Sequence, residues 1–131
     1  MTIFRKKGFT LVEIMIVVAI IGIIIAIAVP AFLRARENAR GRACQENLMK
    51  IDGATEQWAL DFRRSNGDTL DMDSIVGNTL YIKREPVCPS DGDYSNGSSG
   101  FTVGTDPECS IGTTSQPYVE HVLPDASAFN G

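Results

Sequence analysis

The hydrophobic positions of this chain are concentrated in one segment near its N-terminus. Residues 14–33 are all apolar, glycine or proline, with no charge and no hydroxyl group. At a rise of about 1.5 Å per residue, a helix of that length spans roughly 30 Å, the thickness of a bilayer's hydrocarbon core. The pattern therefore predicts a helix that lies in a membrane or in a comparable apolar environment.

A second pattern follows directly, in which single apolar residues recur at helical spacing. Residues 34–65 are rich in good helix formers. Small or apolar side chains fall three or four positions apart at Cys44, Leu48, Ile51, Thr55, Trp58 and Phe62. This spacing predicts one buried face on a polar helix. We expect one helix over residues 9–65, ended by Asn66-Gly67, with a kink or local unwinding at Pro30.

The pattern changes again after the predicted helix. Residues 66–131 are rich in Gly, Ser, Asp, Asn and Pro. Short apolar groups stand between these residues at positions 80–82, 100–103, 109–111 and 118–119. Such groups indicate short strands separated by turns, and residues 71–76 indicate a helical turn or loop. The expected fold class is α+β, with the long helix packed on a small antiparallel sheet.

Charge and composition narrow the possible function classes. The 131 residues include 12 Lys and Arg against 16 Asp and Glu, for a formal net charge of −4. An acidic chain is a poor nucleic-acid binder, and the apolar residues outside the N-terminal segment are too few for a deep enzyme active site. Anionic lipid headgroups or carboxylates of neighbouring subunits suit the arginines that follow the segment: Arg34, Arg36, Arg40 and Arg42.

Two ordinary interpretations of the N-terminal segment are available. A secretory signal fits the basic residues 5–7 and the small residues Ala26 and Ala28, and it would release a small secreted domain. A plain single-pass anchor fits the apolar length. Glu13 argues against both, because a carboxylate near the start of an apolar helix costs about 2.5–3.5 kcal/mol and needs a partner.

A third interpretation comes from the residues that surround Glu13. The run Lys7-Gly8-Phe9-Thr10-Leu11-Val12-Glu13 resembles the class III signal of the type IV pilin superfamily. The resemblance implies that a prepilin peptidase removes residues 1–8 as a leader by cutting between Gly8 and Phe9. It further implies N-methylation of Phe9 and a glutamate, here Glu13, as the fifth residue of the mature chain.

The same resemblance divides the chain and implies its partners. Residues 9–33 would be the transmembrane and later filament-core helix, residues 34–65 its amphipathic continuation, and residues 66–131 a small β-rich head. Pro30 lies in a stretch that resembles the pilin segment able to melt during assembly. The implied partners are further copies of the chain in a homopolymer, membrane lipid before assembly, the peptidase, and an inner-membrane assembly platform with its ATPase.

Glu13 and Phe9 have a physical reason to act together in assembly. They lie four residues apart, about 6 Å along a helix. In a bundle of staggered parallel helices, Glu13 of one subunit can meet the free Phe9 amine of the next, so that both buried charges are paired. We therefore expect Phe9, Glu13 and Pro30 to be assembly residues. The alternative is that Glu13 only reaches the lipid headgroups.

Two filament types are consistent with this motif. The surface pilus is favoured, because a closed cysteine loop is typical of pilins and because residues 66–70 lack the Tyr-Pro-Thr-like motif of major pseudopilins. The alternative is a pseudopilin of a type II secretion system. In either case the chain would first lie in the inner membrane and then in an extracellular pilus or a periplasmic pseudopilus.

The three cysteines suggest a disulfide. The stretch from Cys88 to Cys109 resembles the disulfide-bounded C-terminal loop of pilins, and this resemblance implies a Cys88–Cys109 bond in an oxidising compartment. Cys44, on the predicted buried face, is expected to be a buried free thiol. The alternative is that Cys44 pairs with Cys88 or Cys109.

Evidence for a metal or cofactor in the sequence is weak. Asp91 and Asp93 stand in a loop that loosely resembles a calcium loop, but the loop has Thr102 where an EF-hand has glutamate. A solvated turn is expected there instead. His121 stands alone in the sequence, with no matching Cys or Asp cluster beside it, so no metal or catalytic role is assigned to it. No cofactor is expected, with calcium as the alternative.

Overall fold

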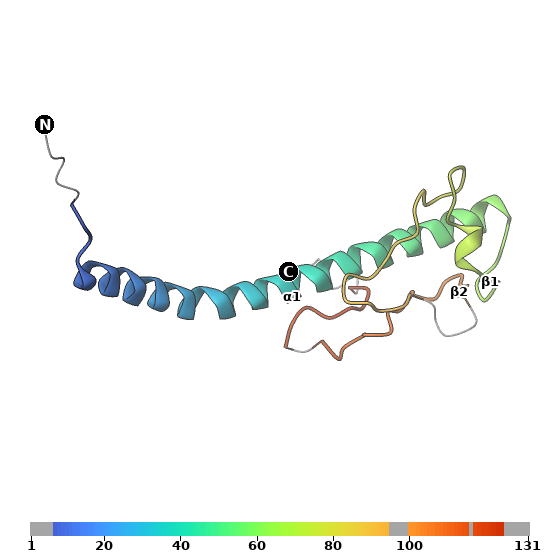
Figure 1. The fold of residues 1–131 in the computed structure, drawn as a ribbon. Helices are drawn as coiled ribbons and strands as arrows, with labels where there is room; N and C mark the ends of the chain where they lie inside the picture. The colour runs from blue at the N-terminus through green and yellow to red at the C-terminus, as the bar shows by residue number, and fades with distance from the viewer. Residues whose placement is uncertain (1–6, 95–99, 116, 125–131) are drawn as a thin grey trace, which may run out of the picture. The chain divides into compact units, whose positions relative to one another are not determined.

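The computed structural model describes residues 7–94, 100–115 and 117–124. Its elements are the helix α1 (Leu11–Asp61), the strand β1 (Thr69–Leu70), the 3-10 helix η1 (Met72–Ser74) and the strand β2 (Phe101–Thr102) (Figure 1). The chain divides into two compact units, residues 1–35 and residues 36–131, and α1 contributes to both. A long helix with a small antiparallel sheet confirms the expected α+β class.

The first unit contains the apolar half of α1. Every large hydrophobic side chain between Leu11 and Leu33 is at least 48% exposed. Within the described residues, α1 is the one helix long and apolar enough to cross a membrane. The helix continues through Pro30 without interruption, so the expected local unwinding is absent from this structure.

In the second unit one face of α1 is buried. Its buried residues recur three or four positions apart and are Gly41, Cys44, Leu48, Ile51, Ala54, Thr55 and Ala59. Four of the six positions predicted for this face are therefore confirmed. Trp58, a fifth, is half-buried at the edge of the core. The prediction for Phe62 is wrong, because this side chain is 59% exposed. Its ring centroid lies 5.6 Å from that of Trp58.

Helix α1 ends at Asp61, earlier than the sequence predicts. Arg63 adopts a left-handed conformation with φ of 51°. The Arg64 amide donates a hydrogen bond of 2.8 Å to the Ala59 carbonyl, which closes the last turn in the manner of a Schellman motif. Gly67, predicted to end the helix, lies in the turn that follows, with φ of 96°.

The sheet is smaller than predicted. β1 and β2 pair antiparallel, with Leu70 opposite Phe101. The other apolar groups form no strand among the described residues, although Ile82 and His121 each take part in an isolated bridge. Frequent turns explain the difference, since segments between glycines and prolines are too short to extend a ladder. Residues 71–76, predicted as a helical turn or loop, contain the short 3-10 helix η1.

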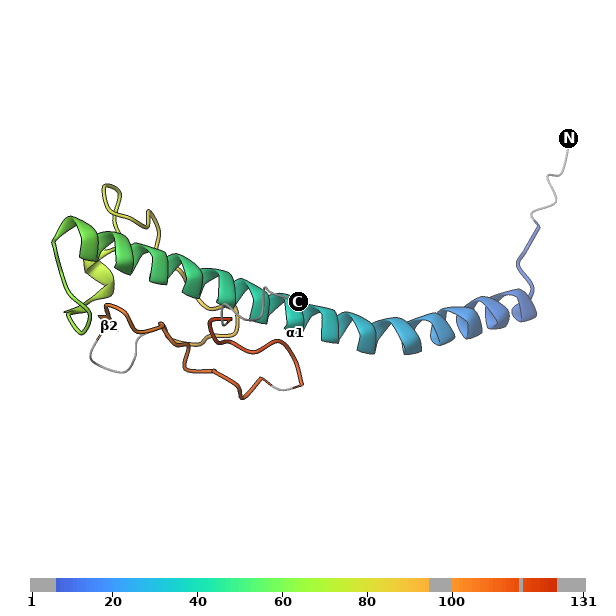
Figure 2. The ribbon, with the colours of Figure 1, turned by 180° about the vertical axis from the view of Figure 1, so that it is seen from behind.

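Loops supply the other side of the core in the second unit. The buried apolar side chains that follow α1 are Leu70, Ile75, Cys88, Tyr94, Phe101, Val103 and Cys109. In both views, residues 100–115 and 117–124 lie along the part of α1 that belongs to this unit (Figures 1 and 2). With so little sheet, the head depends on the buried face of α1 for its core.

We expect Leu48→Ala to destabilise the head strongly. Leu48 is fully buried, so truncation removes apolar contacts and leaves a cavity, at a cost of about 2–5 kcal/mol in the free energy of unfolding. Urea unfolding of the full chain in detergent, followed by Trp58 fluorescence, measures this loss. Leu60→Ala is the matched control, because Leu60 lies on the same helix but is 78% exposed. Equal unfolding midpoints for the two variants would contradict the burial of this face.

Candidate functional site

The predicted cleavage site lies in an irregular segment just before α1. Gly8 and Phe9 are exposed, and Phe9 is 85% exposed. A Cβ atom placed on Gly8 would meet no atom within 4 Å apart from its chain neighbours, so this position is not covered by other parts of the chain. The structure does not itself test cleavage, and the roles of both residues stay predictions.

Glu13 has a partner within its own chain. The Thr10 amide donates a hydrogen bond of 2.8 Å to Glu13 Oε2, and the Glu13 amide donates one of 3.3 Å to Thr10 Oγ1. These reciprocal bonds form a capping box, which satisfies two of the free amides at the start of α1. This role was not predicted from the sequence, although threonine followed three residues later by glutamate is its known signal.

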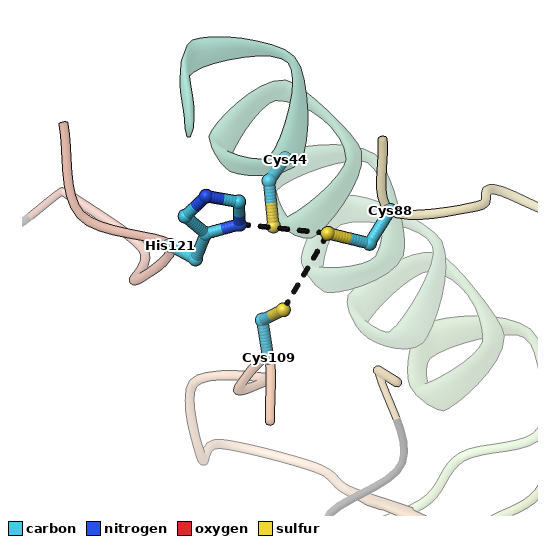
Figure 3. Close-up of side chains that lie close together, drawn as sticks. All are labelled: Cys44, Cys88, Cys109 and His121. Carbon is cyan, nitrogen blue, oxygen red and sulfur yellow. Dashed lines mark hydrogen bonds between the residues drawn. The ribbon is translucent and has the colours of Figure 1, made fainter. Parts of the chain in front are cut away.

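A second candidate site lies in the head, where four side chains from distant parts of the sequence meet (Figure 3). Cys44, Cys88, Cys109 and His121 are 0%, 1%, 4% and 2% exposed. Their three Sγ atoms and one ring nitrogen all lie within 4.8 Å of one another. Among the described residues, no other group of three or more His, Cys, Asp and Glu side chains comes together in this way.

Cys88 Sγ lies close to two other ligand atoms of this cysteine–histidine cluster. Cys88 Sγ lies 3.8 Å from Cys109 Sγ and 3.5 Å from His121 Nδ1. A disulfide requires about 2.05 Å between the sulfurs, so Cys88 and Cys109 are close but not bonded. The predicted disulfide is therefore not confirmed, whereas Cys44 is a buried free thiol as expected.

Burial controls the protonation of the cluster. Loss of water raises the pKa of the Cys44 thiol well above its usual range, and it also raises the pKa of the Cys109 thiol. Burial lowers the pKa of His121, and the nearby Glu37 carboxylate opposes that shift only in part. At neutral pH these shifts favour neutral thiols at Cys44 and Cys109 and a neutral imidazole at His121.

Hydrogen bonds hold the residues next to Cys88 and Cys109 in place. Asn47, one helical turn beyond Cys44 on α1, donates through Nδ2 to the Val87 carbonyl at 3.0 Å. The Ser110 amide donates to the Asp93 carbonyl at 2.8 Å, and the Asp93 amide donates to Ser110 Oγ at 2.9 Å. The residue before Cys88 and the residue after Cys109 are thus both fixed in place.

The segment that carries His121 is tied directly to α1. Asn38 Oδ1 accepts a hydrogen bond of 3.1 Å from the Val119 amide, and Gln45 Nε2 donates one of 3.0 Å to the Glu120 carbonyl. Gly41 lies between these two helical positions, and a Cβ there would collide with the Val119 backbone. A glycine is required at this point because the segment approaches the helix backbone so closely.

The remaining candidates from the sequence lie apart from this cluster. Asp91 has a left-handed backbone, with φ of 58°, in the turn that follows Cys88, and Asp93 acts through its main chain in the contacts with Ser110. Neither belongs to a group of potential metal ligands in the described residues. Of the four arginines, Arg40 forms an ion pair of 3.0 Å with Glu37.

Comparison with known proteins gives one family match and several relatives. The family model described as the prokaryotic N-terminal methylation motif matches residues 3–29. The type II secretion system core protein G of Klebsiella pneumoniae is 29% identical over 121 residues, covering 78% of this chain and 86% of that protein. No solved structure matches the chain.

Two further relatives carry different names. The type IV major pilin protein PilA of Myxococcus xanthus is 50% identical over 47 residues, covering 36% of this chain and 21% of that protein. The competence protein ComGC of Bacillus subtilis is 28% identical over 86 residues, covering 66% of this chain and 84% of that protein. With the methylation motif at its start and relatives of both filament types, this chain is similar to the type IV pilins and the type II secretion pseudopilins.

Proposed function

We propose that this protein is a structural subunit of a pseudopilus-type filament, related to the core protein G of type II secretion systems. It is a filament protein and not an enzyme, in keeping with its relatives. The proposal reverses the order of preference that the sequence favoured, in which the surface pilus came first. Of the two grounds for that order, the closed cysteine loop is not confirmed by the structure.

The extent of the similarity is the observation that carries this proposal. Residues up to the end of α1 are less than half of the chain. A match to core protein G over 78% of the chain must therefore include much of the head. The match to the pilin covers 36% of the chain, which is no more than the helix can account for. The head thus supports the pseudopilin relationship, and the pilus remains the second candidate.

The exposed half of α1 supplies the force for polymerisation. Its large hydrophobic side chains between Leu11 and Leu33 are all exposed in the single chain. Such a large apolar surface is unfavourable in water. Before assembly, lipid of the inner membrane covers this surface. In the filament, the α1 helices of neighbouring subunits cover it. The prepilin peptidase, an assembly platform and its ATPase are the partners that this cycle requires.

The cleavage step depends on Gly8. A branched side chain at Gly8 narrows the approach to the scissile bond, so we expect Gly8→Val to keep its leader and to form no filaments. Gly22→Val is the control, because Gly22 is equally open but lies inside α1. Intact mass and N-terminal sequencing measure the outcome: the control should begin at Phe9. Normal processing of Gly8→Val would contradict the proposed cleavage site.

The charge of Glu13 can be separated from its role in the capping box. Glutamine also serves in capping boxes, so Glu13→Gln keeps the cap of α1 and removes only the charge. If Glu13 pairs with the Phe9 amine of the next subunit, its loss leaves a buried charge at every contact, at about 3–5 kcal/mol each. We expect Glu13→Gln to be processed and retained in the membrane but not polymerised.

The matched variant is Thr10→Ala, which weakens the cap while the Glu13 carboxylate stays. It should polymerise, because the loss of a capping hydroxyl costs only about 0.5–2 kcal/mol. Immunoblots of membrane and filament fractions compare the two variants with wild type. Filaments from Glu13→Gln at wild-type level would show that the charge is not needed, and that Glu13 acts as a helix cap.

Deletion of the gene distinguishes the two filament types. A pseudopilin is needed for protein export, so we expect secreted enzymes to accumulate inside the deletion strain while surface filaments persist. Quantitative comparison of culture medium and cell fractions, with electron microscopy of the cell surface, gives both readouts. A strain complemented with the intact gene is the control. Loss of surface filaments with normal export would assign the protein to a pilus instead.

A further inference from the structure

The cysteine–histidine cluster in the head has the geometry of a metal centre. Zinc is bound by sulfur at about 2.3 Å and by imidazole nitrogen at about 2.0–2.1 Å, and a tetrahedron with these bonds puts two sulfurs about 3.8 Å apart and sulfur and nitrogen about 3.6 Å apart. The separations of Cys88 Sγ from Cys109 Sγ and from His121 Nδ1 are 3.8 Å and 3.5 Å. Both edges therefore already have the length that a shared zinc ion requires.

The number of donors fits the same explanation. Within the cluster, a disulfide would use two sulfurs and leave a third thiol and an imidazole buried together. A tetrahedral zinc site uses all four, one from each of Cys44, Cys88, Cys109 and His121, with every pair of ligand atoms within 4.8 Å. Three cysteines and one histidine are among the common ligand sets of structural zinc sites.

The chemistry of the donors selects the metal. Thiolate and imidazole favour zinc, whereas calcium and magnesium take oxygen ligands. The cluster offers three sulfurs and a nitrogen, and the aspartates of the neighbouring turn, Asp91 and Asp93, are not part of it. A calcium ion is therefore excluded from this position by ligand type.

We propose that Cys44, Cys88, Cys109 and His121 bind one zinc ion in a closed, structural site. Zn²⁺ binds three thiolates and a neutral imidazole, so three thiols each release a proton to solvent and no electron is transferred. The four protein ligands fill the tetrahedron and leave no position for water or substrate, which is the mark of a structural rather than a catalytic site. The resulting net charge of the centre is −1.

The surroundings of the cluster are built to hold such a site. Gly92 lies so close to Cys109 that a Cβ on it would stand 2.5 Å from Sγ, so the turn after Cys88 packs directly on this ligand. Asn47 Nδ2 donates to Tyr94 Oη at 3.0 Å, and the buried Tyr94 lies beside the Cys44 thiol. Ligands supported by packed neighbours and hydrogen bonds are typical of metal centres.

Such a centre would join four segments that lie far apart in the sequence. One ligand lies on α1, and the other three lie on loops at residues 88, 109 and 121. The strands of the head are two residues each, and small domains with so little regular structure often depend on metals or disulfides. This inference concerns the head alone and holds whether the filament is a pseudopilus or a pilus.

Metal analysis of the full chain tests the proposal. The protein is purified in detergent from zinc-supplemented cells, without chelator, and zinc is measured by elemental analysis. We expect one zinc ion per chain, and X-ray absorption should give three sulfur neighbours and one nitrogen neighbour. Absence of zinc together with a Cys88–Cys109 disulfide by mass mapping would overturn the proposal. This measurement uses the wild-type protein and does not depend on whether a variant folds.

Variants and cobalt substitution test each ligand. Added Co²⁺ should produce the thiolate and tetrahedral absorption bands in the wild type. Loss of a supporting residue outside the ligand set typically lowers metal affinity about 10–100-fold. His121→Ala and Cys44→Ser each remove a ligand, so they should lower zinc affinity by more than this. Asp91→Asn is the control and should bind as wild type does. Unchanged affinity in Cys44→Ser would exclude Cys44 as a ligand and contradict the four-ligand site.

Discussion

The packing of one helix face against loops is the interaction on which the rest of this structure depends. Leu48 and Ile51 are fully buried on α1, and the side chains that cover them come from segments with almost no secondary structure. A two-stranded sheet cannot stabilise itself in water, so the head has no independent core. The same helix that provides the apolar segment for a membrane or filament thus also provides the foundation of the head.

Helical features were the most predictable from the sequence, because periodicity records which side chains face a core. The face through Cys44, Leu48 and Ile51 follows directly from spacing. The end of the helix does not, because Arg63 adopts a left-handed conformation for which arginine has no intrinsic preference. Strand lengths were overestimated, since short apolar groups pack into the core through single residues such as Cys109 without forming a ladder.

The two candidate sites also differ in how far they could be predicted from the sequence. The motif around Gly8 and Glu13 is local, so it is visible in a short run of sequence, and the capping box was available in that run as well. The cluster around His121 is not local. Its ligands stand far apart in the sequence, and only the path of the loops over α1 brings them together. Sequence rules for zinc sites look for pairs of ligands a few residues apart. They cannot detect a site whose four ligands are this far apart in the sequence.

The long reach of these contacts has a consequence for biosynthesis. The bond between Asn38 and Val119 joins residues 81 positions apart, and that between Gln45 and Glu120 joins residues 75 apart. A chain is made and delivered from its N-terminus, so the helix face around Gly41 is completed long before the segment that covers it. The head cannot close until Val119 and Glu120 have emerged. Until then the face of α1 that the head buries is exposed.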